Sequence, residues 1–391
     1  MPRRSRLPLF LGTALGALIL LIGGVVVSAS TTPQDRNVPG TDLPLEVTAS
    51  ATCPVPSLPA RTARACAEVA ARLKALDQVL TALPHQRDWR LGLPDSADPR
   101  ACVALLYSGG PRHRTESGGD GAVTVTLRAR ADAAEIWTRL RRNAELPFLQ
   151  QNLLQELETV WGKFVEASRR EATADVTAGK GGIWYRAAAT PDVMLAQDWS
   201  PNGSSGDPQA TAELEADKLE AALDVQEVLQ AATEDWVVRA EALPTLERAA
   251  PHLPQNAVVW AMLAEAQLRS SLPQRCVDSS SRALRLSPSL SRARYIRALA
   301  HWRLQQLALA ESDLTASLDG RHGDRPEGEA LAARLRARGA VRLLRRNETG
   351  MCEDFFAACA LGDCEGLTLA RRRQQCLDHD QTQNGLKGKT R

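Results

Sequence analysis

The chain has 391 residues, enough for two or three domains, and its charge is nearly balanced, with 48 lysine and arginine against 46 aspartate and glutamate residues. This balance argues against a general nucleic-acid-binding protein, which normally carries a basic excess on one domain. Aromatic residues make up only 4% of the chain, whereas alanine and leucine, two strong helix formers, are abundant. Composition therefore favours a helical protein and indicates no particular activity.

The N-terminal segment carries a membrane signal. Three arginines lie within residues 1–6, and residues 7–27 follow without a single charge. About 20 apolar residues match the hydrocarbon thickness of a bilayer, and arginines before the run place the N-terminus in the cytoplasm. We therefore expect a cytoplasmic tail, a single-pass helix in the inner membrane of a bacterium, and a periplasmic C-terminal part. The alternative is a cleaved signal peptide, with Val27 and Ala29 before the cut.

Changes in composition predict the remaining organisation. Residues 28–60 are rich in proline, serine and threonine, which predicts an extended linker. Residues 61–195 combine helical stretches with two hairpin-like pairs of β segments, the first of which would pair residues 101–107 with residues 122–128. This combination predicts a small α+β domain of no recognised family. A second linker is expected at residues 196–211. Residues 212–376 have almost no strand signal and precede a flexible tail, residues 377–391.

A regular period, close to that of the known helical repeats, runs through the C-terminal part of the chain. In the clearest unit, which begins at Ala257, positions 4, 7, 8, 20, 27 and 32 are Trp260, Leu263, Ala264, Cys276, Ala283 and Pro288. The next unit begins at Ser291 and has Ala298, Ala310 and Leu314 at positions 8, 20 and 24. After an insertion, a further unit places Gly339 at position 8 and Met351 at position 20.

This pattern resembles the tetratricopeptide repeat over roughly residues 212–375, with Cys276 in place of the usual small alanine. The resemblance implies paired antiparallel helices, packed closely at the small residues and stacked so that each pair buries its apolar face. The expected fold class is therefore an N-terminal transmembrane helix, a small α+β domain, and an all-α tetratricopeptide-like helical repeat (α-solenoid). An ordinary helical bundle is the alternative.

The resemblance also implies a concave groove, lined by positions 2, 5, 9, 12 and 13 of the first helix of each unit. The residues at these positions are Val258, Ala261, Glu265, Leu268, Arg269, Arg292, Tyr295, Leu299, Trp302 and Arg303. An aromatic pair flanked by arginines is typical of a binding hot spot, so the expected ligand is a peptide with an apolar anchor and some negative charge. The alternative is that Tyr295 and Trp302 only pack against the neighbouring helix.

Four C-terminal cysteines predict two nested disulfides. Cys352 and Cys359 lie two helical turns apart, about 10 Å along the axis, which is too far for a bond between them. A turn at residues 360–363 would reverse the chain and bring Cys359 towards Cys364 and Cys352 towards Cys376. A zinc site is the alternative, although the close CxxC pairs typical of structural zinc are missing.

Four arginines, Arg334, Arg338, Arg342 and Arg345, recur at helical spacing. A solvated helix face is the expected interpretation, and an acidic partner or lipid head groups are the alternative.

No chemical motif predicts an enzyme. The six histidines are scattered, no HExxH or GxSxG occurs, and GKGG at residues 179–182 lacks the spacing of a phosphate loop. We expect no catalytic residue, metal or cofactor.

The main functional hypothesis is a membrane-anchored periplasmic scaffold that binds an unidentified protein or peptide in the groove, contacts the bilayer through residues 7–27 and binds no nucleic acid. One alternative is an assembly factor or holdase for envelope or cytochrome biogenesis. The other is a ligand-binding or catalytic α+β domain delivered by the repeats.

Overall fold

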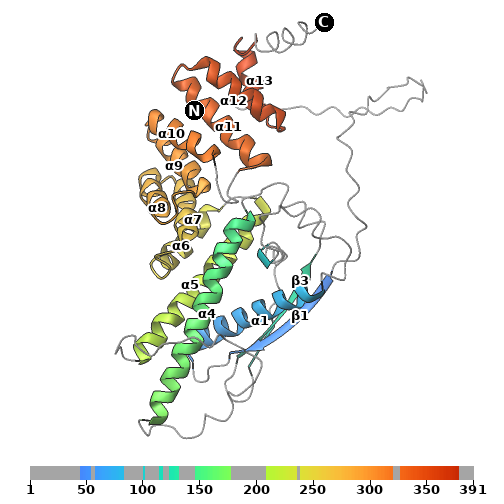
Figure 1. Ribbon diagram of the computed structural model, residues 1–391, viewed down its shortest axis with the longest axis vertical. Coiled ribbons are helices and arrows are strands. Elements are labelled where there is room, and N and C mark those ends of the chain that lie inside the picture. Colours follow the sequence, from blue (N-terminus) through green and yellow to red (C-terminus); the bar gives the residue numbers. More distant parts are fainter. Residues whose placement is uncertain are drawn as a thin grey trace, which may run out of the picture. The chain divides into compact units, whose positions relative to one another are not determined.

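The computed structural model describes residues 45–53, 58–82, 100–101, 114–117, 123–131, 146–177, 208–235, 238–319 and 326–377. The chain divides into two compact units, Met1–Val38 and Pro39–Arg391, and the first lies outside the described residues. The described part of the second unit is mostly helical, with many packed helix pairs and one small antiparallel sheet (Figure 1).

The sheet has three strands in the order β1-β3-β2, namely β1 (Leu45–Thr52), β2 (Arg114–Ser117) and β3 (Val123–Ala131). β1 pairs with β3 from Leu45 opposite Ala131 to Thr52 opposite Thr124. Alternate residues of β1 and β3 are buried because helix α1 (Ala60–Ala82) covers one face of the sheet. The predicted strand at residues 122–128 is confirmed, but its partner comes from residues expected to be a linker, and most of the expected partner, residues 101–107, lies outside the described residues.

Two long helices form the centre of the largest core. α4 (Leu146–Thr177) and α5 (Pro208–Asp235) lie side by side (Figure 1). Their leucines and valines repeat at helical spacing, so each helix buries one apolar stripe. The same core includes residues of α1 and of the first helices that follow α5, so it runs without interruption into the C-terminal part of the chain.

The C-terminal part is a succession of short helices. They are η4 (Ala240–Ala242), α6 (Leu243–Ala249), α7 (Ala257–Arg269), α8 (Pro273–Leu286), α9 (Ser291–Arg303), α10 (Leu307–Leu318), α11 (Gly328–Leu344), α12 (Glu348–Ala360) and α13 (Glu365–Arg372). α7 packs against α8, α9 against α10, and α11 against α12. We call α7, α9 and α11 the first helices of their pairs.

Each first helix ends in the same way. The second residue after its last helical residue has a positive φ, as at Ser271, Gln305 and Arg346, and the next amide N–H donates to a carbonyl five residues back. This is the hydrogen-bonding pattern of a Schellman motif, which satisfies the last carbonyls of a helix. α12 and α13 end in the same motif, at Gly362 and Gln374.

The expectation of a membrane-spanning helix is corrected. Residues 7–27 lie outside the described residues, and no helix that the structure describes is long and apolar enough to cross a bilayer. The longest, α4, has 32 residues but carries charged side chains along its length, including Lys163 and Glu166. The expected fold class and the expected inner-membrane localisation are corrected accordingly: the described fold is mostly helical with a small sheet and contains no membrane-spanning helix.

Candidate binding groove on α9, α11 and α13

In each of two successive helix pairs, an ion pair between an arginine and an aspartate joins the first helix to the second. Arg297 of α9 donates to both carboxylate oxygens of Asp313 in α10 at 2.7 Å. Arg338 of α11 makes the corresponding contacts with Asp354 of α12, the shortest at 2.7 Å, and the sequence separation is again 16 residues. Two ion pairs at the same positions make α9–α10 and α11–α12 structurally equivalent units.

A buried arginine joins one helix pair to the next. Arg334 of α11 is only 1% exposed. It donates to the hydroxyl of Ser291 at the start of α9 and, at 2.9 Å, to the carbonyl of Ser317 near the end of α10. Its guanidinium also lies 5.4 Å from the ring centre of Tyr295. A rigid guanidinium with several donors can hold three helix segments in one register.

The other two of the four arginines at helical spacing, Arg342 and Arg345, also contact neighbouring helices. Arg342 donates to Glu311 of α10 at 3.0 Å and to Asp354, and Arg345 also binds Glu311. Burial alone would raise the pKa of Glu311, but the hydrogen bonds from both arginines outweigh it and hold that pKa below its ordinary value of 4.5. The expected solvated face is therefore wrong, because the acidic partners lie on neighbouring helices.

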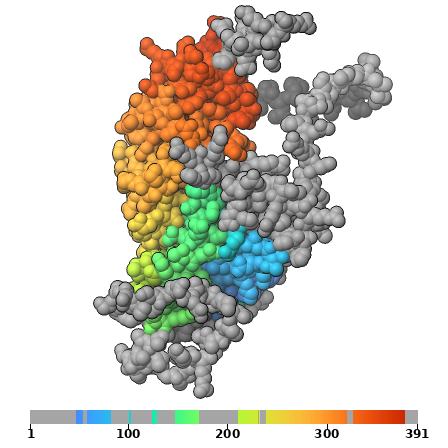
Figure 2. All heavy atoms as spheres, in the orientation of Figure 1, coloured from blue at the N-terminus to red at the C-terminus, as the bar shows by residue number. Residues whose placement is uncertain are grey.

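A cavity of about 440 Å³ lies between α9, α11, α12 and α13. Its apolar lining includes Tyr295, Leu299, Trp302, Leu343, Phe355 and Leu369. A second cavity of about 420 Å³ extends past Arg303 to Leu268 at the end of α7, and it shares Leu299 and Trp302 with the first. We call the two together the α9–α13 groove. In Figure 2 the atoms of α9 to α13 are coloured from orange to red.

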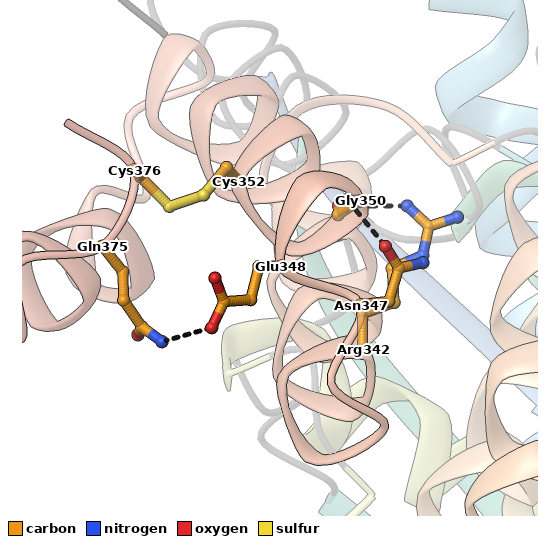
Figure 3. The surroundings of a disulfide bond; sticks show 7 residues. All are labelled: Arg342, Asn347, Glu348, Gly350, Cys352, Gln375 and Cys376. Atoms are coloured by element: carbon orange, nitrogen blue, oxygen red, sulfur yellow. Dashed lines mark hydrogen bonds between the residues drawn. A yellow bond between two sulfur atoms is a disulfide. The ribbon is translucent and has the colours of Figure 1, made fainter. Parts of the chain in front are cut away.

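Two disulfides hold α13, which forms one wall of the groove. Cys359–Cys364 closes the turn before α13, and Cys352–Cys376 ties the segment after it to α12 (Figure 3). This is the nested pairing that the sequence predicted. Next to the second disulfide, Gln375 donates to Glu348 at 3.5 Å.

The other described cysteines differ from these four. Cys53 and Cys66 form a third disulfide between the end of β1 and α1, which the sequence did not predict. Cys276 is a free thiol, and burial raises its pKa to about 12, with Glu265 adding to the effect. A buried thiol with such a high pKa is a packing residue and not a nucleophile at neutral pH.

The predicted groove residues divide into two sets. Tyr295, Leu299 and Trp302 line the larger cavity, and Leu268 and Arg303 line the smaller one. Arg303 also donates to the carbonyl of Leu268, which fixes the guanidinium at that end.

The remaining predicted groove residues lie on or next to α7 and are not in the groove. Val258 and Ala261 are buried in the large core, which α4 shares with α7. Glu265 and Arg292 are buried and paired with each other at 2.5 Å, and Arg269 is exposed 3.8 Å from Glu265. The packing of α4 therefore removes Val258 and Ala261 from the available binding surface.

The sequence prediction missed the contribution of α11. Ala333, Arg336, Ala340 and Leu343 all line the larger cavity. Counted from Gly339 at position 8, they occupy positions 2, 5, 9 and 12. The repeat was predicted to resume at Gly339 after the insertion, but groove positions were predicted only for the two units before it.

The described residues bring together no group of three histidine, cysteine, aspartate or glutamate side chains that could hold a metal ion. The groove itself is an apolar surface with arginines at its edges, which suits the binding of a ligand that is partly apolar and partly acidic.

The fold and the groove define a class of mostly helical proteins built from packed helix pairs. No model of a known protein family and no curated protein matches the chain.

Proposed function

We propose that this protein is an interaction scaffold that binds a polypeptide segment of a partner in the α9–α13 groove. The observation that carries the proposal is the apolar hollow that runs over α9, α11 and α13, with Trp302 shared by both of its parts. Tryptophan and tyrosine in a water-excluding hollow supply a large share of binding energy at protein interfaces. The succession of short helix pairs, and the equivalent arginine–aspartate ion pairs within α9–α10 and α11–α12, support a tetratricopeptide-like repeat as the scaffold.

The compartment in which this scaffold acts is proposed from the disulfides. Three bridges among the described cysteines fit an oxidising environment, because cytosolic reductants keep most cysteines as thiols. A holdase for unfolded clients would use the same groove, and the selectivity of the bound peptides separates it from a scaffold with a defined partner.

The experiment is selection of a displayed random peptide library on the oxidised full-length protein, followed by affinity measurements with the enriched peptides. Leu369→Asp is the informative variant, because Leu369 lines the groove and is 49% exposed. Leu309→Asp is the matched control, since Leu309 is 52% exposed but lies on α10 away from the groove lining. Trp302→Ala removes the shared aromatic.

We expect Leu369→Asp and Trp302→Ala to weaken binding by about tenfold or more, as for hot-spot residues, and Leu309→Asp to bind like the wild type. Equal affinities for Leu369→Asp and Leu309→Asp, with circular dichroism unchanged, would place the binding surface elsewhere.

A further inference from the structure

One charged contact belongs to the lining of the α9–α13 groove. Arg336 and Glu365 both line the larger cavity, Arg336 from α11 and Glu365 from the start of α13. Their side chains form an ion pair, and Arg336 Nε also lies 2.9 Å from Oδ2 of Asp363 in the turn before α13. The guanidinium therefore has two acidic neighbours of different accessibility.

The contact with Glu365 is the one that an incoming group can replace. The side chains of Arg336 and Glu365 are 42% and 64% exposed, whereas that of Asp363 is 23% exposed. Exposed ion pairs contribute little to stability because water screens them and the long side chains lose freedom. Asp363 would keep the guanidinium in place through Nε, and Nη1, which contacts Glu365, could donate to an incoming carboxylate instead.

The charge around the groove also favours an acidic ligand. Arg373 lines the same cavity, and Arg303 lies in the adjoining one. Glu365 is the acidic side chain that lines the larger cavity, so its departure would leave an apolar hollow bordered by arginines. A carboxylate that enters such a hollow gains a charge-assisted hydrogen bond as well as apolar contact.

We propose that Glu365 occupies the place of a partner's carboxylate, and that the groove selects segments in which an aspartate or glutamate lies beside apolar anchors. The inference rests on the proposed function and names the chemistry of the ligand. Binding would exchange Glu365 for the partner's carboxylate on Arg336, so Glu365 acts as an internal competitor and Arg336 as the residue that determines specificity.

The test repeats the library selection on the oxidised full-length protein with Arg336→Gln, Glu365→Gln and the double variant. The probes are the peptides enriched on the wild type and their copies in which glutamate is replaced by glutamine. Arg275→Gln and Glu247→Gln are matched controls, because Arg275 and Glu247 form a surface ion pair at 2.8 Å outside the groove.

We expect acidic residues to be enriched in peptides selected on the wild type and not on Arg336→Gln. Glu365→Gln should bind the acidic peptides about three- to tenfold more tightly, an effect that disappears in the double variant. The control variants should leave the affinities unchanged, and added salt should weaken binding of the acidic peptides more than of the glutamine copies.

Two other outcomes are distinguishable. Peptides that depend on Trp302 but show no acidic preference, or an acidic preference that survives Arg336→Gln, would overturn this inference and leave the proposed function standing. If no enriched peptide depends on Trp302 or Leu369, the proposed function fails, and this inference fails with it.

Discussion

At the scale of single residues, the end of the helix array depends on two glycines that face one aromatic ring. A Cβ added to Gly339 would lie 2.6 Å from Cε1 of Phe355, and one added to Gly366 would lie 2.6 Å from Cδ1 of the same ring. Atoms at that distance cannot coexist without movement of the ring or the backbone. Phe355 therefore joins α11, α12 and α13 because both neighbours lack a side chain.

We expect Gly339→Ala to lower the free energy of unfolding by about 1–3 kcal/mol, although alanine has the higher helix propensity, because the core is overpacked. Gly162→Ala is the control: it lies within α4, and its added Cβ meets nothing within 4 Å. That control should gain about 0.5–1 kcal/mol. Chemical denaturation of both variants measures the difference, and a stabilised Gly339→Ala would contradict the assigned contact.

The Arg297–Asp313 pair gives a second prediction at this scale. In the α7–α8 pair the corresponding positions hold Leu263 and Ser279, so the architecture tolerates an uncharged combination. Arg297→Leu alone leaves Asp313 buried without its main partner, and we expect it to cost about 2 kcal/mol. The double change with Asp313→Ser should recover most of that loss in the same denaturation assay. Simple additivity of the two changes would show that the pair is not coupled.

At the scale of elements, α13 depends on its surroundings for its structure. It has eight residues, and an isolated helix of that length is unstable in water. Its apolar contacts are Leu367 and Ala370, and a disulfide lies at each of its ends. The wall of the groove is therefore braced by covalent bonds to α12.

Reduction of these disulfides should loosen α13 before the rest of the array. We expect hydrogen exchange of the amides of residues 365–372 to accelerate at least about tenfold after treatment with a phosphine reductant, since local opening then costs less free energy. Exchange in α10 should remain unchanged and serves as the internal control, because its core contains no disulfide. Unchanged exchange in α13 would mean that packing alone holds the helix.

At the scale of the whole molecule, the sequence predicted the helices that recur at a fixed repeat length. α7 to α10 follow the spacing of the repeat, and the two nested disulfides followed from helix geometry and one turn. The turn residues after α7 and α9, Ser271 and Gln305, are one repeat apart, whereas the turn residue after α11, Arg346, comes more than one repeat later. The spacing breaks before α11, so the groove residues of that helix were not assigned from the pattern.

Contacts between distant segments account for the other differences. Asn256, which caps α7, donates to Glu156 of α4 at 3.2 Å, and no local pattern around α7 indicates that α4 covers it. The four arginines between residues 334 and 345 were expected to face solvent, because their acidic partners Glu311 and Asp354 lie on other helices. β1 is a short run of alternating apolar and polar residues inside a proline-rich segment. It was not predicted, because the segment was interpreted from its average composition.

The Cys352–Cys376 bridge encloses the turn at Leu361 and Gly362, which is exposed. A protease that cleaves the backbone at this turn would therefore produce two pieces that migrate together on a gel until a thiol reagent separates them. Cys359–Cys364 spans the same turn, so cleavage there would not by itself release the C-terminal end.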